Sequence, residues 1–95
     1  MITADEALKI VNSKLKDVHN SPLFRYAIGQ IDRYVRDASS YGYRSFSYNV
    51  NALAPGHVKP SLLLRKAIAE ELRKNGFSYS EDQRSLGCVW FAVSW

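Results

Sequence analysis

The stretch Ser85–Trp95, SLGCVWFAVSW, decides the fold because it is the most continuously apolar part of the chain. A strand with one buried face should alternate apolar and polar residues, and this stretch barely does. We therefore place Leu86–Trp95 in the middle of a three-stranded sheet. One alternate set of large side chains is expected to face a helix layer, where volume must be filled; it consists of Val89, Phe91, Val93 and Trp95. Trp90 is then left on the open face.

Two shorter segments alternate more clearly and are predicted to flank the central strand. They are RSFSYNV (44–50) and FSYS (77–80), and their inward residues are expected to be Phe46, Tyr48, Val50, Phe77 and Tyr79. The polar segment EDQRS (81–85) is predicted to be the turn of a hairpin that joins the second strand to the third.

Three helices are predicted from apolar spacing and capping residues. The first covers about 4–18, begins with the capping box Thr3-Ala4-Asp5-Glu6, and carries an apolar stripe at Leu8, Val11, Leu15 and Val18. The second begins at Ser21-Pro22, and its internal Gly29 suggests close packing against another helix. The third runs from about Pro60 to Asn75, after the loop NALAPGHVKP (51–60).

The resulting fold class is α+β, with the order α-α-β-α-β-β in a single domain over residues 1–95. We expect a three-stranded mixed sheet in which the C-terminal strand is central and antiparallel to both neighbours. The first two strands are joined through a helix and should be parallel to each other across it. The helices are expected to pack on one face of the sheet.

No catalytic constellation emerges from the residue types present. Two histidines and one cysteine cannot form a usual four-ligand zinc site, and Cys88 in an apolar strand is expected to be an inert small hydrophobe. The five glycines are scattered and form no phosphate-binding loop, and the adjacent acidic pairs do not make a shared site, because neighbouring residues on a helix diverge and the pair Glu81/Asp82 lies in a predicted turn. We therefore predict a protein that is not an enzyme and needs no metal or cofactor.

Targeting signals and charge point to a protein of the cytoplasm. The N-terminus has no basic region followed by an apolar run, and no stretch is long and apolar enough to cross a membrane. A single cysteine suits a reducing compartment. The net charge of +4 is spread along the chain, which permits weak attraction to nucleic acid but does not require it.

Two surfaces are candidate partner-binding sites. Trp90 on the open sheet face is either covered by a long neighbour such as Arg44 or Arg84, or anchors a partner. The second surface is an Arg/Tyr-rich strip within 25–44, since both residue types are favoured in interfaces; its candidates are Arg25, Arg33, Arg36, Tyr34, Tyr41 and Tyr43. A solvated helix face is the alternative for this strip, because aspartates flank two of its arginines.

Over about residues 21–95 the chain resembles small bacteriophage-encoded accessory proteins. The resemblance rests on Tyr-Gly-Tyr-x-Ser-Phe (41–46), LRKNGFSYS (72–80) and the closing VSW (93–95). It implies a phage origin and a compact protein that binds host machinery or phage particles, and no functional residue carries over.

Three functions remain open from the sequence. The first is a non-catalytic phage-encoded accessory protein that binds and modulates a host or phage protein. The second is a nucleic-acid-binding accessory protein, whose binding should weaken steeply with salt. The third is a structural or assembly component that forms oligomers through exposed strand edges.

Overall fold

A computed structural model describes all 95 residues of the chain. Its helices are α1 (Ala4–His19), α2 (Pro22–Ser40) and α3 (Leu62–Lys74), and its strands are β1 (Ser45–Asn49), β2 (Ser78–Ser85) and β3 (Cys88–Ser94). Two short 3-10 helices, η1 (Val50–Leu53) and η2 (Pro55–His57), lie between β1 and α3. The predicted order of helices and strands is confirmed.

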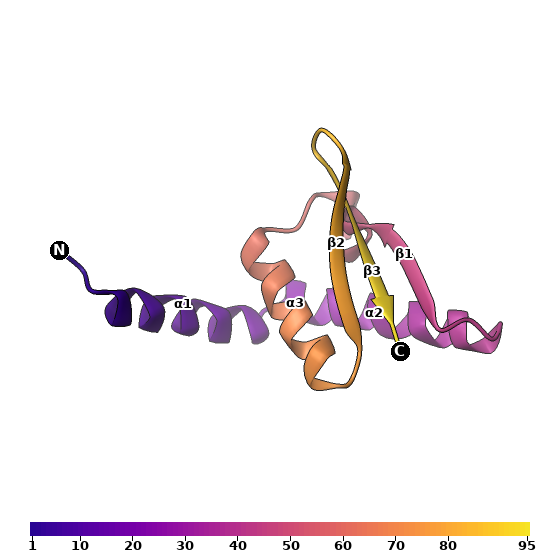
Figure 1. Ribbon diagram of the computed structural model, residues 1–95, viewed down its shortest axis with the longest axis horizontal. Coiled ribbons are helices and arrows are strands. Elements are labelled where there is room, and N and C mark those ends of the chain that lie inside the picture. The colour runs from indigo at the N-terminus through magenta and orange to yellow at the C-terminus, as the bar shows by residue number, and fades with distance from the viewer.

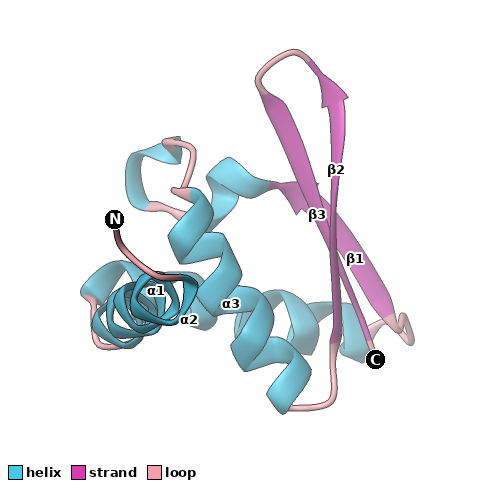
Figure 2. Ribbon diagram, turned by 60° about the vertical axis from the view of Figure 1, so that its left-hand side comes forward, coloured by secondary structure: helices cyan, strands magenta, loops and turns pink.

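The strand order is β1-β3-β2, so the C-terminal strand is central, as the sequence predicts (Figure 2). Both ladders are antiparallel: Tyr48 pairs with Phe91 across the first and Tyr79 with Val93 across the second. The two edge strands are thus parallel to one another without touching. Helices α2 and α3 cover one face of the sheet, and the other face is open.

The core lies between the inner face of the sheet and the helices α2 and α3. On β3, burial alternates along the strand, and Phe91 and Val93 are completely buried. The predicted buried line of α3 is confirmed, with Leu64, Ile68 and Leu72 all buried. Each helix begins at a side-chain cap, which for α2 is Ser21 and for α3 is Ser61 rather than the predicted start near Pro60.

The hairpin is longer than the sequence predicts. Residues 81–85 continue strand β2, where Asp82 pairs with Trp90, and the turn falls instead at Leu86-Gly87. The prediction of a polar turn at 81–85 was wrong because the segment has no apolar residue of its own to mark a strand face, although Glu81, Asp82 and Gln83 pair with Phe91, Trp90 and Val89 of β3. The outer half of the hairpin therefore projects away from the body (Figure 1).

The segment after β1 is also more ordered than a loop. The Asn49 side chain accepts a hydrogen bond from the Asn51 backbone at 2.9 Å, which ends the strand and starts η1. Val50, predicted as the last inward strand residue, is buried but belongs to η1. Leu53, predicted to lie in a loop, is also completely buried, so η1 is a small part of the core.

Helix α1 begins at the predicted cap, where the Thr3 hydroxyl accepts from the Glu6 backbone at 3.2 Å. Its apolar stripe is covered only at the C-terminal end, because residues 1–14 are all exposed and the helix projects beyond the rest of the molecule (Figure 1). The expectation for Gly29 was wrong. This residue is exposed, and a Cβ placed on it meets no atom within 4 Å.

Candidate functional site

A groove of about 320 Å³ separates α3 from β2. Both elements contribute side chains to it, and three of them are basic. The lining residues are Leu62, Arg65, Lys66, Ala69, Glu70, Arg73, Tyr79, Ser80 and Glu81. The small Ala69 leaves room between Arg65 and Arg73, which are separated by two turns of the helix.

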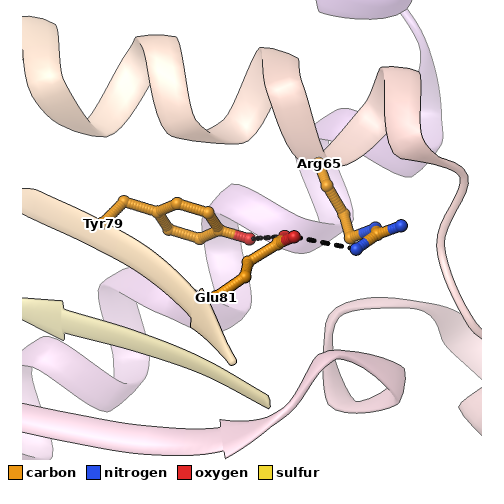
Figure 3. Close-up of polar contacts among 3 residues, drawn as sticks. All are labelled: Arg65, Tyr79 and Glu81. Atoms are coloured by element: carbon orange, nitrogen blue, oxygen red, sulfur yellow. Dashed lines mark hydrogen bonds and ion pairs between the residues drawn. The ribbon is translucent and has the colours of Figure 1, made fainter. Parts of the chain in front are cut away.

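Arg65, Glu81 and Tyr79 form a chain of hydrogen bonds in this groove (Figure 3). The Tyr79 hydroxyl donates to Glu81 Oε2 at 2.5 Å, and Arg65 Nη1 donates to Glu81 Oε1 at 2.8 Å. The side chains of Arg65 and Glu81 are 12% and 25% exposed, so the ion pair is largely shielded from water. Arg65 Nε is buried and has no hydrogen-bond partner. The hydrogen bond from Arg65 Nη1 to Glu81 therefore sets the orientation of the guanidinium.

Tyr79 is held as a neutral phenol. Burial raises its pKa well above the usual value near 10, and the hydrogen bond to Glu81 and the charge of that carboxylate raise it further. Such a hydroxyl donates a hydrogen bond across the physiological pH range and does not act as a base. Its role here is to orient Glu81, and through Glu81 to orient Arg65.

Arg73 closes the other end of the groove. Its Nη2 donates to the Tyr79 backbone carbonyl at 3.3 Å, so both arginines of α3 are bonded to β2. These contacts have a structural consequence, since they hold the hairpin at a fixed distance from the helix. Lys66 and Arg73 remain exposed on the α3 side of the groove.

Trp90 lies on the outer face of the sheet, as the sequence predicts, and it is half-buried. The guanidinium carbon of Arg84 lies 4.6 Å from the centre of the Trp90 ring. Arg84 is also 3.6 Å from Asp82, and both side chains are more than half exposed. The sequence proposes Arg44 or Arg84 as the side chain that covers Trp90, and the structure shows Arg84 in this position. The stacked pair places a positive charge on the projecting hairpin.

The Arg/Tyr strip is divided between two surfaces. Arg25, Arg33 and Arg36 are exposed on α2, and Arg36 pairs with Asp32 at 2.8 Å. Tyr34 is half-buried and packs on β1, with its ring centre 4.5 Å from that of Tyr48. The arginines and Tyr34 thus do not form the single surface that the sequence suggests.

The tyrosines instead gather around a second groove of about 450 Å³ between the end of α2 and β1. Tyr34, Tyr41 and Tyr43 all line it, together with Phe46 and Tyr48 from the strand. Tyr41 is 80% exposed and Tyr43 is 66% exposed. We name this surface the tyrosine groove.

The Arg65–Glu81–Tyr79 chain was missed from the sequence. The signal was present in the alternation, because Tyr79 and Glu81 are two residues apart and share one face of a strand. Assigning residues 81–85 to a turn concealed it. No sequence pattern links Arg65 to Glu81, since sixteen residues and a change from helix to strand separate them.

No family model, no curated protein and no solved structure matches this chain. The resemblance to bacteriophage accessory proteins therefore stays a prediction. None of the helices combines the length and the apolar character needed to cross a membrane. No three His, Cys, Asp or Glu side chains lie together in a way that suits a metal ion.

Proposed function

We propose that this protein binds duplex nucleic acid through α3 and the β2–β3 hairpin. The observation that carries the proposal is the basic groove between these two elements, beside a hairpin that projects past the body. The major groove of DNA admits an α-helix or a two-stranded ribbon. In the proposed complex the projecting ribbon enters the major groove, and α3, which hydrogen bonds from Arg65 and Arg73 hold beside the ribbon, contacts the phosphates.

Basic side chains lie around this unit. Lys66 and Arg73 are exposed on α3 and Lys59 precedes the helix, whereas Arg84 lies on the hairpin, stacked on Trp90 on the face of the sheet opposite α3. The N-terminal end of α3 and the tip of the hairpin point toward the same end of the molecule (Figures 1 and 2). Glu70 and Glu81 also line the groove, and Glu81 pairs with Arg65, so the excess positive charge there comes from Lys66 and Arg73. Phosphate contacts by such side chains give affinity without sequence information.

The test is binding of a fluorescently labelled short DNA duplex, followed by anisotropy between about 50 and 200 mM salt. We expect Lys66→Ala and Arg84→Ala each to weaken binding and to lower the salt slope by about 1. Arg33→Ala is the matched control, because it removes one exposed positive charge from α2 and should leave binding nearly unchanged. Absence of binding at low salt, or equal weakening by all three variants, would contradict the proposal.

A second candidate function is binding of a host or phage protein, and the tyrosine groove favours it. Tyrosine is enriched in protein interfaces because it offers a large apolar area and a polar tip. Asp37 also lines this groove and no arginine or lysine does, so it suits a protein surface better than phosphate.

This second function predicts that Tyr41→Ala combined with Tyr43→Ala abolishes capture of a discrete protein from a host lysate. Tyr26→Ala serves as the control, because Tyr26 is exposed on α2 and does not line the tyrosine groove. Capture that survives the double substitution would dismiss this surface. The same double variant should bind the DNA duplex normally, which separates the two functions.

A further inference from the structure

Helix α1 carries an apolar seam that the molecule itself covers only in part. The seam has the alternating three- and four-residue spacing of a helix that packs on another helix; its residues are Ala4, Leu8, Val11, Leu15 and Val18. Leu15 and Val18 pack against the core. Leu8 and Val11 are 58% and 44% exposed, beyond the edge of the body. Half of a packing surface is thus left without a partner.

An uncovered helix of this kind is not stable by itself. Isolated helices shorter than about 12–15 residues are marginal in water, because nucleation is costly and most helix stability comes from packing. Residues 4–14 make up such a segment, with every residue exposed. A partner on the seam would supply the missing packing.

The charges of α1 indicate what that partner is. Asp5 and Glu6 lie in the first turn, whereas Lys14 and Lys16 lie near the other end, with Asp17 beside them. Residues 1–20 contain three acidic and three lysine residues, so the segment as a whole is neutral at pH 7. A neutral helix lacks the excess of cations that an anionic membrane or nucleic acid attracts. Its separated charges instead complement those of an identical helix in the opposite direction.

We infer that α1 pairs with α1 of a second copy of this chain, antiparallel, and that the protein is a dimer through this contact. The acidic first turn of each helix then lies level with the lysines of the other helix, and the two helix dipoles point in opposite directions. In the register that sets Leu8 opposite Val11, the uncovered Leu8 and Val11 of each helix pack against those of the other. A parallel pair would bring like charges together at both ends.

The first test is the mass of the full chain in solution, measured by sedimentation over a range of concentrations. We expect a dimer, and we expect Leu8→Glu combined with Val11→Glu to raise the dimer dissociation constant at least about tenfold. Ile10→Glu is the matched control: Ile10 is exposed on the same helix but lies about 100° or more around it from the seam, so its variant should remain a dimer. A wild-type monomer at all concentrations, or a dimer that survives the double substitution, overturns the inference.

The second test concerns direction, and it uses a Cys88→Ser background so that one new thiol is present. Ala4→Cys would place two thiols side by side in a parallel pair and form a disulfide readily under mild oxidation. In the antiparallel register described above, the two copies of residue 4 are about 17 Å apart along the axis, at 1.5 Å per residue. We expect no disulfide, and rapid cross-linking would show that the direction is wrong.

Discussion

Replacing Phe91 with alanine is expected to destabilise the fold by about 3–5 kcal/mol, the cost typical of truncating a buried phenylalanine. The ring is completely buried at the centre of the sheet. It contacts Phe46 edge-on, with ring centres 5.8 Å apart, and stacks on Tyr79 at 6.2 Å. Since small domains have total stabilities of about 5–15 kcal/mol, much of the variant should be unfolded at moderate urea concentration. Urea titration followed by circular dichroism measures the loss.

Trp90→Ala is the control, because Trp90 is the next residue along the same strand and its side chain points to the other face. It is half-buried and Arg84 stacks on it, so its removal should cost much less than the loss of Phe91. An equal loss from both variants would mean that the open face of the sheet is as well packed as the inner one, and would contradict a core confined to the inner face.

The second large effect is expected at high pH and depends on Tyr79. The pKa of Tyr79 is raised in the folded state, so above about pH 10 the folded chain holds a proton that the unfolded chain releases. Stability is then lost as pH rises, by up to about 1.4 kcal/mol for each pH unit. Below pH 10 the Tyr79 hydroxyl is protonated in both the folded and the unfolded chain, so it adds no dependence of stability on pH. Tyr79→Phe removes the slope, together with the hydrogen bond to Glu81.

Wild type should therefore be more stable than the Tyr79→Phe variant near pH 8, and the difference should shrink between pH 10 and 12. Urea titrations at several pH values give both curves. Tyr41→Phe is the control, because Tyr41 is 80% exposed and its loss should leave the alkaline slope unchanged. A difference between wild type and Tyr79→Phe that stays constant with pH would contradict the neutral state assigned to Tyr79.

The features that could be predicted from the sequence are those that local chemistry determines. Ser21 caps α2, and the alternation of large and small residues on β3 sets which face is buried. The failures concern segments whose structure depends on what lies beside them. Residues 81–85 look like a turn because no apolar residue marks a face, yet the ladder with β3 continues through them. The stripe of α1 looks like a buried face, yet Leu8 and Val11 have no partner in the same chain.

The candidate site was harder to predict because tertiary contacts assemble it. Arg65 and Glu81 meet only after α3 packs along β2, and the alternation that would have paired Tyr79 with Glu81 was concealed by the predicted turn. The tyrosine groove could be predicted in part, since Tyr34, Tyr41 and Tyr43 were already candidates. That these tyrosines lie on a different surface from the arginines of α2 is clear only once the position of β1 in the fold is known.

The central position of β3 also determines the order in which the chain can mature during synthesis. Strands β1 and β2 pair with β3 and not with each other, so neither ladder exists until residues 88–94 have been made. After β1 has been synthesised, some forty further residues must be translated before it can pair with β3. During this time its strand edge and its aromatic side chains are exposed. Exposed strand edges and apolar surface make such intermediates prone to aggregation. The protein should consequently depend on chaperones more than its small size suggests.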